Sequence, residues 1–177
     1  MRTSMRLAVA AVLAVIQVIL AVSGFTTVPL PNGINVTVLF LPSMLAGVLA
    51  GILPGAAVGA VFGVTSLALA TAALFQNPVI AIVPRVLIGP TAALFFRGFR
   101  QTNEIVGLAL AGVSGAIANT GLVLALATVV PGPGGAAYLA PDAALEIART
   151  NIPLEALTGA LAAIVIGVPL RAIAARR

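Results

Sequence analysis

Three polar side chains stand out because each falls within an otherwise apolar stretch. Arg85 ends an uncharged run that begins at Leu7, and Asn119 and Glu155 follow in later apolar segments. An arginine near the bilayer centre costs roughly 2.5–3.5 kcal/mol on insertion scales, so it normally has a partner or a function. A guanidinium can also bind a carboxylate through two parallel hydrogen bonds. These residues therefore predict a polar binding site in which Arg85 binds an anionic group.

The composition around these residues is that of an integral membrane protein. The chain has 177 residues, of which 61% are hydrophobic and 7% charged, and its mean hydropathy is +1.21. Water-facing surfaces need more charge than this, whereas lipid-facing surfaces exclude it. The net charge of +5 comes from arginines at the predicted helix ends, so it does not indicate nucleic-acid binding.

Three residue types that carry much of enzyme chemistry are missing. The chain contains no cysteine, histidine or lysine. Thiolate nucleophiles and the commonest general base and metal ligand are therefore excluded. A Walker A loop also cannot form without its phosphate-binding lysine. We expect no enzymatic activity, no ATPase site, and no metal or other cofactor.

Turn-forming clusters divide the chain into six predicted transmembrane helices in a single membrane domain, residues 1–177. The predicted helices cover residues 7–22, 36–52, 55–74, 79–96, 105–127 and 152–174. A short polar helix is expected at 142–149. The expected fold is a compact all-α bundle with outside links at 23–35, 75–78 and 128–151.

The arginines predict the orientation of this bundle. With a cytoplasmic N-terminus, one side of the membrane carries Arg149 and the other carries Arg2, Arg6, Arg97, Arg100, Arg171, Arg176 and Arg177. This asymmetry follows the positive-inside rule and predicts that both termini are cytoplasmic. An alternative is that the basic start and the apolar run to Ser23 form a cleaved signal peptide.

The depth of the three polar residues supports one site in the outer half of the bundle. Arg85 lies six residues into its helix, about 9 Å from the outer end at 1.5 Å per residue. Asn119 and Glu155 reach comparable depths by the same measure. Pro84 has no N–H, so it frees a backbone carbonyl one turn earlier as a local acceptor.

Structural alternatives to a binding site stay open for each of these residues. Arg85 and Glu155 could form an ion pair that serves only to neutralise both charges. Asn119 could be a hydrogen-bonding contact between helices. Asn35 and Asn77 lie in outside links, where each is either a turn residue or part of the mouth of a substrate cavity.

Small residues recur every fourth position. One series is Gly47, Gly51, Gly55, Gly59 and Gly63; others are Gly107, Ala111 and Gly115, and Gly159, Ala163 and Gly167. Such stripes let the backbones of neighbouring helices approach closely, which predicts tight internal packing. Ala10 and Ala14 form a similar pair in the first helix. They could pack internally or dock a second membrane subunit, and both interpretations remain open.

These features in this order resemble the substrate-binding S components of energy-coupling factor (ECF) vitamin transporters. The similarity is best in Pro29–Ser66 (PLPNGINVTVLFLPSMLAGVLAGILPGAAVGAVFGVTS) and Asn77–Gly89 (NPVIAIVPRVLIG). The shared pattern is a Pro/Gly link, Thr37 and Pro42, the glycine series, and the Pro-Arg pair followed by Gly89. The alanine pair on the first helix also resembles the family's contact surface for a coupling subunit.

The resemblance implies a six-helix protein of the bacterial plasma membrane that captures a vitamin or vitamin precursor from outside. Its implied partners are the lipid bilayer, a transmembrane coupling subunit and two ATPase subunits that supply energy. Its implied substrate site includes Arg85, Asn119 and Glu155, with Asn35 and Asn77 at the mouth. Ala10 and Ala14 would contact the coupling subunit.

One departure from the family pattern bears on the substrate. Close relatives often carry histidine before the proline of the second helix, where this chain has Phe40. The substrate of those relatives therefore cannot be transferred. Pantothenate is the leading expectation because its carboxylate suits Arg85, and other vitamins remain open.

Other functional classes explain fewer of the residues. A stand-alone ion- or proton-coupled carrier could use Glu155, but the six short helices show no inverted repeat. An intramembrane enzyme would need a nucleophile and base that the composition lacks. A purely structural scaffold would account for the glycine stripes but not for Arg85.

Overall fold

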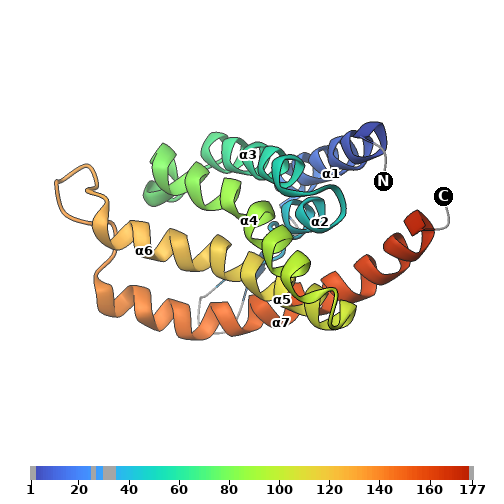
Figure 1. Ribbon diagram of the computed structural model, residues 1–177. Coiled ribbons are helices and arrows are strands. Elements are labelled where there is room, and N and C mark those ends of the chain that lie inside the picture. The colour runs from blue at the N-terminus through green and yellow to red at the C-terminus, as the bar shows by residue number, and fades with distance from the viewer. Residues whose placement is uncertain (1–2, 25–26, 30–34, 176–177) are drawn as a thin grey trace.

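The computed structural model describes residues 3–24, 27–29 and 35–175 of the chain, which form a helical bundle (Figure 1). The helical elements are α1 (Thr3–Ser23), α2 (Leu41–Ala50), α3 (Ile52–Ala68), the 3₁₀ helix η1 (Ala73–Gln76), α4 (Pro78–Phe99), α5 (Glu104–Ala116), the π-helix η2 (Ile117–Gly121), α6 (Leu122–Val129) and α7 (Pro141–Ala175). Two short antiparallel strands, β1 (Thr27–Pro29) and β2 (Asn35–Thr37), pair Thr27 with Thr37.

Within the described residues, four helices are long and apolar enough to cross a membrane. They are Thr3–Ser23, Pro78–Phe99, Glu104–Val129 and Pro141–Ile173, and the third of them joins α5, η2 and α6 without a break. The other two apolar helices, α2 and α3, are shorter. At 1.5 Å per residue α2 is only about 15 Å long, half of a typical hydrocarbon core. The described residues thus form six helical rods of unequal length in a multi-pass membrane protein.

The second helix differs from the predicted span 36–52. Residues 35–37 form β2, and the helix begins only at Leu41, with Pro42 in its first turn. A proline is tolerated there because the first N–H groups of a helix have no intrahelical partner. The apolar, β-branched residues before Leu41 were assigned to the helix from their hydropathy alone, and hydropathy does not distinguish a strand from a helix end.

The break between the second and third helices lies at Gly51. The predicted spans 36–52 and 55–74 had placed this break a few residues later, between them. Gly51 has φ +113°, a conformation that glycine adopts without the steric cost of a Cβ. Because α3 already begins at Ile52, Pro54 falls in its first turn and breaks nothing. The position of a glycine with positive φ therefore decides where the chain reverses.

The helix α7 corrects the prediction of a polar helix at 142–149 separated from a span at 152–174. Both belong to one 35-residue helix that begins within the predicted link 128–151 and contains Pro153. Asp142, Glu146 and Arg149 are exposed on its first turns. The polarity of these residues matches their exposure and does not mark the end of a helix. Figure 1 shows α7 running along the length of the bundle.

Glycines hold α2, α3 and α4 together at backbone contact. A Cβ added to Gly47 would lie 2.1 Å from the carbonyl oxygen of Gly89, and one added to Gly89 would lie 2.4 Å from the carbonyl carbon of Gly55. One added to Gly59 would lie 2.1 Å from the carbonyl oxygen of Arg85. No side chain fits at these positions, so the glycine series packs these three helices internally.

A second glycine contact joins α5 to α7. A Cβ on Gly112 would lie 2.2 Å from the carbonyl carbon of Gly159. Gly112 is not part of the predicted stripe, whose Gly115 instead faces Met44 of α2. The stripe with four-residue spacing therefore identified Gly159 on α7 but missed its partner on α5.

The two ends of the bundle differ in what they carry. Figure 1 shows both chain termini at one end, near the turn between α4 and α5. The opposite end carries η1 and the link between α6 and α7. Between them lies an apolar core that includes Phe40, Met44, Phe62, Ile88, Phe96 and Leu108.

Candidate functional site

A cavity of about 560 Å³ lies at the end of the bundle remote from the termini. Its walls come from the last turns of α1 and α3, from η1, and from α4, η2, α6 and α7. Apolar side chains dominate the lining. The polar side chains within it include Thr37, Arg85, Asn119, Thr120, Asn151 and Glu155. The structure therefore brings Arg85, Asn119 and Glu155 into one cavity.

Arg85 is positioned by the proline beside it. Pro84 lies inside α4 and has no N–H to donate to the carbonyl of Ile80. The Nη1 group of Arg85 donates to that carbonyl oxygen instead, at 2.9 Å. The expected acceptor one turn before Pro84 is thus confirmed. This contact fixes one edge of the guanidinium within the helix that carries it.

Two aromatic rings hold the remainder of the guanidinium. Its central carbon lies 4.8 Å from the ring centroid of Phe75 in η1 and 5.5 Å from that of Phe62 in α3. Arg85 is only 5% exposed, and its Nε atom is buried without a hydrogen-bond partner. A buried donor left unpaired costs about 1–3 kcal/mol or more when it is charged, so this atom would gain from a bound acceptor.

Glu155 lies on another wall of the cavity and is 1% exposed. Its Oε2 accepts a hydrogen bond from the hydroxyl of Thr120 at 2.5 Å, and its Oε1 accepts one from the backbone N–H of Thr37 at 3.3 Å. The carboxylate therefore links η2, α7 and the segment at β2. Each carboxylate oxygen can accept more than one bond, so Glu155 can still receive a donor from a ligand.

Asn119 lies in η2, a π-helical turn between α5 and α6. The side chain is 2% exposed, and its Nδ2 donates to the hydroxyl of Thr120 at 3.3 Å. Its Oδ1 is buried and has no hydrogen-bond partner. Turns of this kind are frequent at functional sites because they interrupt the regular helix ladder. Asn119 thus presents an available acceptor beside Glu155.

The alternative of a direct ion pair between Arg85 and Glu155 is not what the geometry shows. In the described part of the chain these two side chains have no nitrogen–oxygen distance within 4.0 Å, and the ion pair that forms is Arg171 with Glu104. Arg85 and Glu155 still attract each other electrostatically. Each has its own local partners.

The two asparagines predicted for the cavity mouth are placed differently. Asn77 is the N-cap of α4, and its side-chain oxygen accepts a hydrogen bond from the N–H of Val79 at 3.0 Å. It does not line the cavity, so the turn interpretation fits its position. The backbone of Asn35 belongs to β2, opposite Pro29. The side chain of Asn35 lies outside the described residues.

The two alanines predicted as a docking contact, Ala10 and Ala14, are half-buried on α1. They lie on the side of the helix that carries the fully buried Gln17, and α1 packs against α2 and α3. The opposite side of α1 is exposed and apolar, with Val12, Val15 and Ile19 each about 60% exposed. The alanines thus lie on the side of α1 that faces α2 and α3, opposite the exposed apolar face.

Several residues of the site were not predicted as site residues from the sequence, and Thr37 was noted only as part of the family pattern. Thr120 and Thr37 hold Glu155, Phe62 and Phe75 face Arg85, and Asn151 lines the cavity. Threonines and phenylalanines are too common in membrane helices to be recognised singly. The available signal was position: Thr120 follows Asn119 directly, and Phe75 precedes the link to the helix that carries Arg85.

The polar groups of the cavity are those that can orient a small organic molecule. Among the residues that the structure describes, no group of three or more His, Cys, Asp or Glu side chains could hold a metal. One cation, one carboxylate, two amides and several hydroxyls on mostly apolar walls can orient a small polar molecule. The fold and the cavity thus define a multi-pass membrane protein with a small-molecule site.

Comparison with protein-family models identifies the family. The model of the ECF transporter substrate-specific component matches residues 5–173. Because this match covers nearly the whole chain, the protein belongs to that family, and the resemblance drawn from the sequence is confirmed. Members of the family are substrate-binding transport subunits that associate with the ECF transporter module. No curated protein sequence matches the chain.

Proposed function

We propose that this protein captures an anionic vitamin or vitamin precursor in the cavity around Arg85 and delivers it to an ATP-driven ECF uptake complex. The observation that carries the proposal is the buried guanidinium of Arg85, whose Nε lacks a partner at the wall of a cavity. A carboxylate bound there would replace the missing hydrogen bond and neutralise the charge. The cavity volume lies in the range typical of small-molecule sites.

Pantothenate is the substrate that we favour. Its carboxylate suits Arg85. Its hydroxyl and amide N–H groups could donate hydrogen bonds to Glu155 and to the Oδ1 of Asn119. Its apolar methyl groups and methylenes would contact the aliphatic lining of the cavity. This arrangement would satisfy the buried polar atoms on separate walls at once.

A ligand screen tests this function directly. The purified protein should be melted in the presence of a panel of vitamins and precursors, and hits should be titrated by calorimetry. Pantothenate is expected to raise the melting temperature most, since a ligand that binds only the folded state stabilises it. A preference for a cationic or uncharged compound would contradict an anion at Arg85, and the absence of any hit would remove the capture function.

The orientation and partners form a second part of the proposal. We place both termini in the cytoplasm of a bacterial cell, with the cavity open to the outside, because the end near the termini carries most of the arginines. The helix α1, with its exposed apolar face and the half-buried Ala10 and Ala14 on the opposite side, would dock the transmembrane coupling subunit. Two ATPase subunits would supply the energy, so the isolated chain should bind substrate without sustaining uptake.

The orientation can be tested with single cysteines, because the natural chain has none. Thr3→Cys and Gly134→Cys, an open position in the link between α6 and α7, should react with an impermeant maleimide from opposite sides of the membrane. Labelling of both positions from the same side would contradict the topology.

A further inference from the structure

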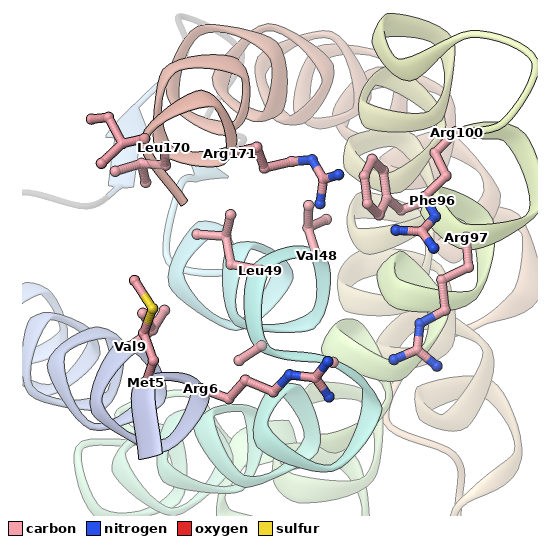
Figure 2. A pocket seen from close by; sticks show the side chains of 13 residues that line it. Met5, Arg6, Val9, Val48, Leu49, Phe96, Arg97, Arg100, Leu170 and Arg171 are labelled. Carbon is pink, nitrogen blue, oxygen red and sulfur yellow. The ribbon is translucent and has the colours of Figure 1, made fainter. Parts of the chain in front are cut away.

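A second pocket lies at the end of the bundle that carries the termini. Its volume is about 650 Å³, and it is lined by residues of α1, of the end of α2, and of the last turns of α4 and α7 (Figure 2). Four arginines surround it: Arg6, Arg97, Arg100 and Arg171. The cavity around Arg85 shares no residue with this pocket.

The positive charge of this pocket is only partly compensated. Arg171 pairs with Glu104, and within the described residues Arg6, Arg97 and Arg100 have no carboxylate within 4.0 Å. No acidic residue lines the pocket. Figure 2 shows Arg6 and Arg97 extending toward each other beside the end of α2. Side chains of like charge gain from a shared anion between them.

Phe96 holds two of the guanidinium groups in place. The central carbon of Arg171 lies 4.5 Å from the ring centroid of Phe96, and that of Arg100 lies 6.0 Å from it. Cation–π contacts at such distances restrict the arginines to the pocket wall. The site is therefore pre-arranged on an aromatic ring that is itself 1% exposed.

The remaining lining is apolar. Met5 and Val9 of α1 and Leu170 of α7 lie on the side of the pocket away from α4, with Leu49 of α2 between them (Figure 2). Ile173 of α7 also lines the pocket. The residues of α1 and α7 belong to the ends of helices that are long and apolar enough to cross a membrane. A ligand that fits both surfaces must have an anionic head and an apolar tail.

We propose that this pocket binds one anionic phospholipid, with the headgroup phosphate between the arginines and the start of an acyl chain against α1 and α7. Phosphate groups match the planar donors of several guanidinium groups. Basic pockets between transmembrane helices are known to bind anionic headgroups. A free phosphate ion would use the arginines but would leave the apolar walls unoccupied.

Native mass spectrometry of the full-length protein in detergent tests this site. Phosphatidylglycerol should bind as one lipid per protein, in preference to phosphatidylcholine of the same chain length. Arg97→Gln and Arg100→Gln should each weaken its binding about fivefold and together about 25-fold, from about 1 kcal/mol per arginine. Arg149→Gln, which removes an exposed arginine at the other end of the molecule, should bind phosphatidylglycerol as the unmodified protein does. Circular dichroism of each variant checks that the fold is retained.

Three results would overturn the proposal. Equal binding of the two lipids would show that the arginines do not select the headgroup. Complete displacement of phosphatidylglycerol by inorganic phosphate would indicate a site for the free ion. If the variants bind lipid normally but assemble poorly with the coupling subunit, the pocket is a protein interface.

Discussion

The cavity around Arg85 and the pocket at the opposite end both contain arginines from α4, but the guanidinium groups differ in how deeply they are buried. Arg85 is 5% exposed, bonded at one edge to its own helix and enclosed by two aromatic rings. Arg97 and Arg100 are exposed to solvent. A buried charge interacts strongly with a matched partner because water does not screen it, whereas exposed charges are weakened by solvent and salt. The same residue type would therefore suit a selective substrate site at one end and the proposed phospholipid pocket at the other.

The largest effect on substrate affinity is expected for Arg85→Ala. Removal of one partner of a buried charged contact costs about 2–5 kcal/mol, or about 30-fold to several thousand-fold in affinity. Calorimetric titration with the ligand identified by the vitamin screen measures this loss. Arg149→Ala serves as the control because it removes an exposed arginine outside the cavity, and its affinity should be unchanged.

The same variant also tests the ion-pair alternative. If Arg85 served only to neutralise Glu155, Arg85→Ala would lower the melting temperature, and adding Glu155→Ala would restore it with substrate affinity unchanged. Because Glu155 has its own hydrogen bonds from Thr120 and Thr37, we expect no such rescue. Restored stability with normal affinity would place the substrate elsewhere.

Arg85→Lys should have an intermediate effect. The charge is kept, but the two-point geometry for a carboxylate and the donor to Ile80 are lost. Affinity should fall by about 1–3 kcal/mol, the range for hydrogen bonds to charged groups, while the melting temperature stays close to that of the natural chain. Affinity equal to that of the natural chain would mean that charge alone binds the substrate.

Gly59→Ala should have a smaller effect on affinity and a clear effect on stability. Its new Cβ would lie 2.1 Å from the carbonyl oxygen of Arg85, so α3 and α4 must separate. Overpacking of this kind costs about 1–3 kcal/mol of stability, and the displaced Arg85 should bind substrate several-fold less well. Gly98→Ala is the matched control, because no atom lies within 4 Å of its added Cβ. Thermal unfolding of both variants measures the difference; equal melting temperatures would show that α3 adjusts freely.

The smallest effect on affinity is expected for Ala14→Leu on α1. Ala14 lines neither the cavity around Arg85 nor the pocket at the opposite end. Substrate affinity should therefore stay within about twofold, as for independent sites. Uptake by the assembled transporter should fall because a larger side chain hinders close approach of a partner helix. A loss of substrate binding or folding would show instead that Ala14 packs only against α2 and α3.

The parts of this protein that the sequence predicted are those that depend on charge in an apolar setting. Arg85 and Glu155 were recognisable because lipid excludes charge. Pro84 indicated a free carbonyl one turn earlier, that of Ile80, because proline lacks an N–H. These inferences need no knowledge of which helices are neighbours. The positions of Arg85, Asn119 and Glu155 along their helices were enough to place them at similar depth.

The parts that could not be predicted depend on contacts between distant segments. The start of α2 was placed too early because β2 forms only when its partner β1 is present. Gly112 was missed because its role is a close contact with Gly159 of another helix, which local spacing does not reveal. The hydroxyl of Thr120 and the N–H of Thr37 acquire their role only when the fold brings them to Glu155.

The π-helical turn η2 also determines how the rod from Glu104 to Val129 presents its two halves. A π turn accommodates one residue more than an α-helical turn does, and in an α-helix each residue rotates the helix face by about 100°. A deletion of one residue within Ile117–Gly121 would let the ladder close as a regular α-helix. The whole of α6 would then rotate relative to α5, and Val123 and Leu124 would turn away from the cavity they now line. The number of residues in this segment therefore sets how α6 faces the cavity. Relatives of this protein should tolerate substitutions in the segment more readily than a change in its length.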